Sequence, residues 1–201
     1  MIVAGITGTI GTGKTTVASM FKELGAFIID HDQLARLVIE PGKKAWQELI
    51  DQFGSGITDN GRNIDRTKLA SIVFNDPEYL QKLNSIVHPE ILNEDIRLTN
   101  ERKAVDPEGL IIKDVPLLLE VGSEIAHLLV DKIIVVYASP EIQFKRLISR
   151  GMSEGDARRR IDSQIPVKSK LKDADFVINN DGTLEETRQQ VQDVYSKLMA
   201  R

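Results

Sequence analysis

Residues 8–15 of the chain read GTIGTGKT, which fits the phosphate-binding pattern G-x-x-x-x-G-K-[ST]. The apolar, β-branched run from Ile2 to Thr7 predicts a buried strand before this loop. The stretch Lys14–Leu24 has the apolar spacing of an amphipathic helix, and Gly25 closes it. A strand, this loop and a helix in that order predict a site for nucleotide phosphates; the alternative is a glycine-rich turn that binds nothing.

The loop residues have distinct expected tasks. Backbone N–H groups around the glycines would converge on phosphate oxygens, and the N-terminus of the following helix adds partial positive charge. Lys14 would reach the β- and γ-phosphates, the Thr15 hydroxyl would ligate Mg²⁺, and Thr16 would lie near the α-phosphate. The ATP-binding residues expected in the loop are Gly11, Thr12, Gly13, Lys14, Thr15 and Thr16.

The rest of the chain alternates between short apolar runs and helical patterns. This alternation predicts a three-layer α/β/α P-loop fold around a doubly wound, five-stranded parallel sheet. The four further strands are expected at residues 26–29, 110–115, 133–137 and 176–178, and helices at residues 140–149 and 184–199. Asp114, near the end of the strand expected at residues 110–115, receives no firm role.

A connection of almost 80 residues between Asp30 and Gly109 contains no clear strand. Helices are expected at residues 33–39, 43–53, 66–74 and 77–102, with Asp65 and Asp76 as N-caps. We therefore expect a single kinase-like domain. Its core is residues 1–30, 109–148 and 173–201, its helical acceptor-binding insertion is about 31–108, and its lid is about 149–172.

Composition excludes several classes of protein. The 201 residues are 41% hydrophobic and 28% charged, as in an ordinary globular domain, and their net charge of −4 argues against a nucleic-acid partner. The absence of cysteine excludes disulfides, zinc–thiolate sites and cysteine nucleophiles. No apolar run is long enough to span a membrane, and the N-terminus lacks a basic signal segment. We expect a cytoplasmic protein without a membrane partner, most simply a monomer.

The charge is unevenly distributed. Residues 145–172 hold nine basic and three acidic residues, a local charge of +6, which leaves −10 on the remainder. A basic lid would stabilise a triphosphate and its transition state and would exclude water as a competing acceptor. The alternative is a solvated helix face with ordinary surface charges.

Asp30 and Asp32 directly follow the second predicted strand. In extended chain their i, i+2 spacing places both carboxylates on one face, at the strand ends that line the site in this fold. One would take the proton of an attacking hydroxyl, and the other would help to hold hydrated Mg²⁺. Alternatively, either residue caps a helix that begins at Gln33, and both roles can coexist.

Other motifs narrow the class of P-loop protein. The guanine-reading motif Asn-Lys-x-Asp is absent, and the D-x-x-G match at Asp51–Gly54 lies at a predicted helix end rather than after a strand. Helicases and transporters of this class are usually larger. The compact size, helical insertion and basic late segment favour an enzyme resembling a nucleotide kinase.

Seven segments, spread over almost the whole chain, occur in an order that resembles the dephospho-coenzyme A kinase family: GITGTIGTGKTTVA, IIDHDQLARLVIEPG, HPEI, VPLLLE, RLISRGMS, DSQIP and ADFVINNDG. The D-x-D-x-x-A-R-x-x-x-x-P-G block is far more specific than the loop alone. The resemblance implies transfer of the ATP γ-phosphate to the ribose 3′-hydroxyl of dephospho-CoA, with Mg²⁺ as cofactor. His31 and Thr9 depart from the family, which usually has a small residue and often a glycine there.

The resemblance also implies roles for individual residues. Asp32 resembles the catalytic base, acting with Lys14 and with Arg150 of the lid. Thr15 would hold Mg²⁺ together with Asp30 or Asp32 through water. The acceptor-binding residues implied are Asp32, Arg36, His88, Pro89, Leu117 and Glu120. The further ATP-binding residues implied are Arg146, Asn180 and Gly182.

Two other functions remain open from the residues. A nucleoside or nucleoside-monophosphate kinase would use the same insertion and lid. A regulatory nucleotide-binding module would need no turnover, although intact Lys14, Thr15 and Asp32 argue against it. In addition, His88 before Pro89 has a purely structural interpretation as a helix break, because a residue preceding proline avoids helical angles.

Overall fold

The computed structural model describes residues 1–119 and 123–200. These residues form two compact units. The sheet unit consists of residues 1–30 and the chain from residue 102 onward, and the helical unit consists of residues 31–101. Among the described residues, no helix combines the length and apolar character needed to cross a bilayer.

The sheet unit is built on five parallel strands in the order β2-β5-β1-β6-β7. The strands are β1 (Ile2–Thr7), β2 (Phe27–Asp30), β5 (Leu110–Asp114), β6 (Lys132–Tyr137) and β7 (Phe176–Asn179). The predicted five-stranded parallel sheet is confirmed. Because helices cover both faces, the central strands are apolar almost throughout, and all five residues of β5 are buried.

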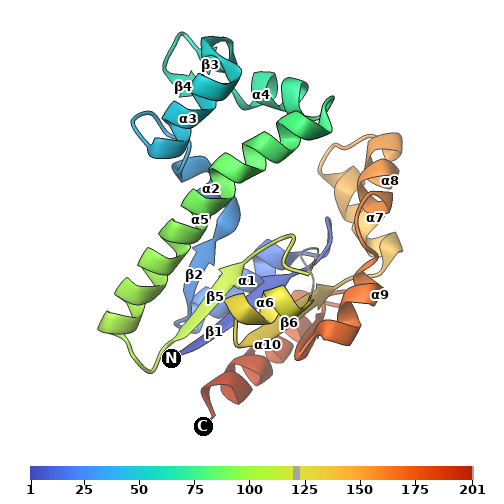
Figure 1. Cartoon of the computed structure of the whole chain (residues 1–201). Helices are drawn as coiled ribbons and strands as arrows, with labels where there is room; N and C mark the ends of the chain where they lie inside the picture. The colour runs from blue at the N-terminus through green and yellow to red at the C-terminus, as the bar shows by residue number, and fades with distance from the viewer. Residues whose placement is uncertain (120–122, 201) are drawn as a thin grey trace. The chain divides into compact units, whose positions relative to one another are not determined.

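Two apolar clusters line the two faces of this sheet. One joins strand residues such as Ile6 and Ile134 to Phe21 of α1 (Lys14–Glu23) and Val191 of α10 (Leu184–Met199). The other joins Ile133 and Val135 to residues of α6 (Ser123–Leu129) and α9 (Val167–Lys170). This arrangement is the three-layer α/β/α architecture (Figure 1).

The predicted lid follows α7 (Pro140–Ser149), whose proline occupies the first turn as expected. Residues 149–172 contain α8 (Glu154–Asp162) and α9, and the 3₁₀ turn η2 (Leu171–Asp173) comes last. Helix α8 packs on α7, where the Arg158 guanidinium lies 5.0 Å from the centre of the Phe144 ring. The cation–π contact fixes one of the basic side chains of this segment.

The helical unit contains α2 (His31–Leu37), α3 (Lys44–Phe53), α4 (Arg66–Val73) and most of α5 (Pro77–Val105). The expectation of no strand here is wrong. After the 3₁₀ turn η1 (Ser55–Ile57), β3 (Thr58–Asp59) and β4 (Asn63–Ile64) form a short antiparallel hairpin. Its turn, residues 60–62, begins with Asn60-Gly61, whose φ angles are 45° and 75°. Asn-Gly is a strong hairpin signal because both positions tolerate positive φ.

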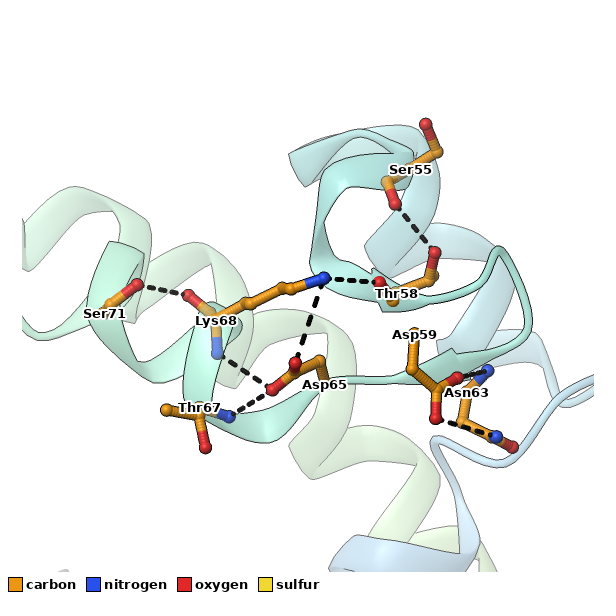
Figure 2. Close-up of polar contacts among 8 residues, drawn as sticks. All are labelled: Ser55, Thr58, Asp59, Asn63, Asp65, Thr67, Lys68 and Ser71. Carbon is orange, nitrogen blue, oxygen red and sulfur yellow. Dashed lines mark hydrogen bonds and ion pairs between the residues drawn. The ribbon is translucent and has the colours of Figure 1, made fainter.

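The start of α4 is fixed by a polar network (Figure 2). Asp65 accepts hydrogen bonds from the backbone N–H groups of Thr67 and Lys68 at 3.0 and 3.1 Å, so the predicted N-cap is confirmed. The Lys68 ammonium then donates to the Thr58 carbonyl at 2.9 Å. These bonds tie the first turn of α4 to the hairpin.

Helix α5 continues through Pro89 without a break, so the helix-break interpretation of His88–Pro89 is wrong (Figure 1). Proline removes one helical hydrogen bond and disfavours helical angles before it. Val87 and Ile91, on either side of Pro89, both pack into the apolar core of the helical unit. Tertiary packing on both sides of the proline therefore outweighs its local preference.

Candidate active site

The loop between β1 and α1 requires glycine at two positions. Gly13 is the N-cap of α1 with φ of 88°, and a Cβ there would overlap the Asn180 side-chain amide. Gly11 has φ of 81°, and a Cβ there would lie 2.9 Å from the Gln143 carbonyl oxygen. Only glycine satisfies both the positive φ and the close approach, so the loop can pack tightly against α7 and the chain after β7.

Side chains from two other elements bind the carbonyl groups of this loop. Arg146 on α7 donates to the carbonyls of Gly11 and Thr12 at 3.2 and 3.1 Å. Asn180 donates to the Thr12 carbonyl at 2.7 Å, and its own carbonyl accepts from Arg146 at 2.7 Å. Arg146 and Asn180, both expected to contact the nucleotide, are thereby brought to the loop, where they hold its backbone.

The buried hydrogen bonds of Thr9 and Gln143, which we call the brace, continue this network into the protein interior. The Thr9 hydroxyl donates to the Gln143 side-chain oxygen at 2.9 Å, and the Gln143 amide donates to the Ala138 carbonyl at 2.7 Å. Thr9 and Gln143 are both buried, so each bond replaces one with water. The Ile10 N–H donates to the side chain of Gln164 at 2.7 Å, which ties the predicted lid segment to the loop as well.

A cation and two carboxylates meet at the ends of the strands. Lys14 forms an ion pair with Asp114, the last residue of β5, which is 6% exposed. Asp114 is the register partner of Asp30 at the end of β2. Sequence reasoning named Asp114 but gave it no firm role. The signal was present, because a carboxylate ending a buried run, beside the strand of a phosphate loop, lies at the ligand edge of such a sheet.

These residues suit Mg²⁺ better than they suit a metal held by protein alone. Within residues 1–119 and 123–200, no group of three or more histidine and acidic side chains converges on one point. Mg²⁺ keeps several waters and is usually bound by one or two carboxylates plus substrate phosphates. The exposed Thr15 hydroxyl in the first turn of α1, with Asp114 and Asp30 at adjacent strand ends, fits that requirement.

Comparison with known proteins gives a consistent result along the whole chain. The model of the dephospho-CoA kinase family matches residues 1–186. A dephospho-CoA kinase from Aquifex aeolicus is 45% identical over 194 residues, which cover 96% of each chain. The chain belongs to the dephospho-CoA kinase family. The predicted P-loop fold, the kinase class and ATP as phosphoryl donor are thereby confirmed.

Two solved structures are similar to this chain over almost its whole length. A crystal structure from Thermus thermophilus has a TM-score of 0.81 at 33% identity, covering 98% of this chain and 97% of that one. A dephospho-CoA kinase from Campylobacter jejuni has a TM-score of 0.68 at 27% identity, covering 98% and 96%. The similarity therefore spans the helical unit of this kinase as well as its sheet unit.

The remaining residues predicted to act on the nucleotide lie at helix ends. Thr16 is exposed in the first turn of α1, and Arg150 is exposed at the C-cap of α7. Gly182 precedes α10, which begins with a capping box between Thr183 and Glu186. The Thr183 backbone N–H, and then its hydroxyl, lower the pKa of Glu186 below its ordinary value, because both bind the carboxylate.

The residues predicted to bind the acceptor lie mainly in the helical unit. Asp32 is in the first turn of α2 and Arg36 in its last turn, both exposed and one helical turn apart. His88 and Pro89 are exposed on α5. Leu117 lies in the sheet unit, exposed in the loop after β5. Glu120 lies outside the described residues.

The expected geometry of Asp30 and Asp32 needs correction. Strand β2 ends at Asp30 and α2 begins at His31, so the two carboxylates belong to different elements and do not share a face by extended-chain alternation. His31 is the first residue of α2, and its Nε2 atom lies 3.8 Å from Oδ1 of the buried Asp95 on α5. The helix starts two residues earlier than expected, and this earlier start places the two carboxylates on different elements.

Proposed function

We propose that this chain transfers the γ-phosphoryl group of ATP to the ribose 3′-hydroxyl of dephospho-CoA. The products are ADP and coenzyme A, and the reaction is the last step of coenzyme A biosynthesis, carried out in the cytoplasm. The observation that supports this most strongly is the family match across residues 1–186, which includes both the phosphate loop and the helical unit.

Lys14 and the start of α1 would act on the phosphates. Phosphoryl transfer is promoted mainly by positioning and by electrostatic stabilisation of the phosphoryl oxygens. The ion pair with Asp114 holds the Lys14 ammonium at the edge of the sheet before nucleotide binds. Phosphate oxygens would then share this ammonium with Asp114, whose carboxylate would keep it oriented. Arg150, exposed at the end of α7, would supply a second cation from the lid.

Thr15, Asp114 and Asp30 would hold Mg²⁺, mostly through its waters. When bound, the ion neutralises charge on the β- and γ-phosphates. The sequence left Asp30 and Asp32 as alternative partners of Thr15 at the Mg²⁺ ion. We prefer Asp30 together with Asp114, because these two residues are register partners on adjacent strands. Asp32 is then available for the acceptor.

Asp32 would take the proton of the attacking 3′-hydroxyl as a general base. The peptide chain itself keeps the Cα atoms of Asp30 and Asp32 within about 7 Å of each other. The proposed base therefore lies only two residues along the chain from Asp30, at the end of β2. Arg36 and His88 would bind the acceptor, the arginine by gripping an acceptor phosphate with its planar fork.

The experiment is an acceptor panel with the purified full-length chain. With ATP and Mg²⁺, dephospho-CoA should yield ADP and coenzyme A, resolved by liquid chromatography. AMP, CMP and adenosine should be far poorer acceptors. Rapid turnover of a nucleotide and none of dephospho-CoA would establish a nucleotide kinase instead. Tight ATP binding without transfer to any acceptor would establish a binding module.

A further inference from the structure

Residues 9–12 of the phosphate loop form a β-turn. The Thr12 N–H donates to the Thr9 carbonyl at 3.2 Å, and Gly11, the third residue of the turn, has φ of 81°. Positive φ at the third residue, with glycine there, is the signature of a type II turn. The bond that closes this turn uses the N–H of neither central residue, Ile10 or Gly11, so both amides can donate to groups outside the turn.

The Ile10 amide has its acceptor in the predicted lid. Its N–H donates to Oε1 of Gln164 at 2.7 Å, across 154 residues of sequence. Gln164 is half-buried and lies just after α8, two residues before Pro166, the N-cap of α9. Val167, in the first turn of α9, is buried in the apolar cluster on the sheet. Gln164 therefore lies where the chain passes from the lid helix to the sheet, directly against the phosphate loop.

A carboxamide that accepts through its oxygen still has two N–H donors on its nitrogen. In Gln164 this nitrogen is bonded to the same carbon as Oε1, so it also lies close to the turn. Backbone N–H groups of such a loop converge on phosphate oxygens. An oxygen bound by the Gly11 N–H would therefore lie beside the Gln164 carboxamide.

We propose that Gln164 is a further catalytic residue, whose Nε2 donates to an oxygen of the terminal phosphate of ATP while its Oε1 accepts from Ile10. Thr16, expected near the α-phosphate, lies within α1, so the turn at residues 9–12 is at the other end of the loop, toward the terminal phosphate. This role rests on the proposed phosphoryl transfer from ATP, whichever acceptor takes the phosphate.

The bond to the loop gives this donor its value in the reaction. Negative charge on the oxygens of the transferred group is stabilised best by donors that are already oriented, because they need no reorganisation during the reaction. The Ile10 N–H orients the carboxamide from the loop side. Glutamine is also neutral, so it can accept from the loop without placing a negative charge beside the phosphates.

Two substitutions separate the two ends of the carboxamide. Gln164→Glu keeps an oxygen for the Ile10 N–H but has no donor when ionised, whereas Gln164→Leu removes both. In both variants kcat should fall about 10²-fold, the usual loss for one donor to a transition-state oxygen. Gln164→Glu should keep the Tm of the wild type, because the bond to the loop remains. Wild-type kcat in Gln164→Glu would show that this bond alone suffices and would overturn the inference.

The control for the added charge is Ser163→Glu, which places the same carboxylate on the neighbouring exposed residue at the end of α8. Its kcat should stay close to that of the wild type. If Ser163→Glu reproduces the loss seen in Gln164→Glu, charge in the lid rather than a missing donor is the cause, and the inference fails.

A binding measurement without any acceptor identifies the phosphate that Gln164 contacts. By calorimetry, Gln164→Leu should weaken binding of the non-hydrolysable β,γ-imido analogue of ATP about tenfold, as for a lost hydrogen bond to a charged group. Binding of ADP, which lacks the terminal phosphate, should be unchanged. Equal losses for both nucleotides would assign the effect to the shape of the loop and overturn the inference. A wild type that does not phosphorylate dephospho-CoA would overturn only the proposed acceptor, since this measurement uses none.

Discussion

In the sheet unit, the side chains behind the phosphate loop are buried and bonded to one another, whereas site residues of the helical unit lie on exposed helix faces. Gln143 and Asn180 are 2% and 3% exposed, and each bonds both the loop region and a second residue. Asp32, Arg36 and His88 are all exposed. The first region is therefore held by buried hydrogen bonds, and the second presents its predicted site residues on the surface.

This difference follows from what each region has to recognise. A phosphate group has one compact, charged shape, so a rigid nest of backbone N–H groups loses little entropy on binding and suits it well. An acceptor with a long flexible arm needs contact over a larger surface. The contrast predicts that variants in the sheet unit affect ATP, and variants in the helical unit affect the acceptor or the proton transfer.

The largest effect is expected from Asp32→Asn. If this variant of the helical unit changes ATP binding, the predicted separation of roles between the two units is wrong. Asparagine keeps the size of the side chain but cannot take a proton, so kcat should fall roughly 10²–10⁴-fold, the usual range for a lost general base. ATP affinity, measured by calorimetry, should be retained. Asp51→Asn on α3 is the control, because asparagine there still accepts the bond from Gln47. Near-normal kcat would remove Asp32 from this role.

Lys14→Ala should come next, with a loss of roughly 10²–10³ in kcat/KM for ATP, as for other removed groups that stabilise transition-state charge. Dephospho-CoA should bind as before, since the lysine belongs to the sheet unit. Lys22→Ala, in the last turn of the same helix, is the matched control and should behave as wild type. If both substrates bind more weakly in Lys14→Ala, the two regions are not energetically separate.

Sequence periodicity is sufficient for the elements that form locally. The bounds of β1, α7 and α10 are predicted to the residue, because one apolar period, a proline in the first turn and a Thr-x-x-Glu cap act within each segment. The hairpin at Asn60-Gly61 was missed although its signal is local, since strands of two residues have no measurable period.

Long-range contacts could not be predicted in the same way. The partners Thr9 and Gln143 are 134 residues apart, and Lys14 and Asp114 are 100 apart, so no spacing rule connects them. For Pro89 the sequence left two answers open, a continuous helix over residues 77–102 and a local break. The packing of Val87 and Ile91 into a common core explains why the helix continues. The residue types of the brace were visible in the sequence, but their partners were not.

A third variant, Gln143→Leu, tests the sheet unit alone. It removes the hydrogen bonds of the brace and leaves the loop residues expected to bind phosphate unchanged. The Thr9 hydroxyl and the Ala138 carbonyl would both lose a buried partner, which costs about 1–3 kcal/mol. For a chain of this size, Tm should fall by about 2–10 °C. KM for ATP should rise several-fold while KM for dephospho-CoA is unchanged.

The control for this variant is Gln189→Leu, which removes an exposed glutamine whose side chain bonds Asp193, four residues along the same helix. Its Tm and both KM values should remain close to those of wild type, because water replaces the lost bond. A Gln143→Leu enzyme with lowered Tm but unchanged KM for ATP would show that the brace stabilises the fold without shaping the loop.

The smallest effect is expected from Glu186→Gln, at the helix start that follows Gly182. Because the pKa of Glu186 is lowered in the folded chain, the carboxylate stabilises the fold fully above its ordinary pKa of 4.5. That contribution is lost as the pH falls through the folded pKa. Glutamine keeps an acceptor for Thr183 but carries no charge, so Tm should fall by only about 1–2 °C at pH 7.

The same comparison as the pH is lowered decides whether charge is the cause. The wild-type carboxyl becomes protonated as the pH falls through its lowered pKa, so the difference in Tm between wild type and Glu186→Gln should shrink. Glu185→Gln, the neighbouring acid in the same first turn, removes one charge near the helix dipole but leaves the capping box intact. If Glu185→Gln reproduces the full pH-dependent loss, the helix dipole alone accounts for it. If only Glu186→Gln shows the pH-dependent loss of Tm, the hydrogen bonds between Glu186 and Thr183 stabilise the start of α10.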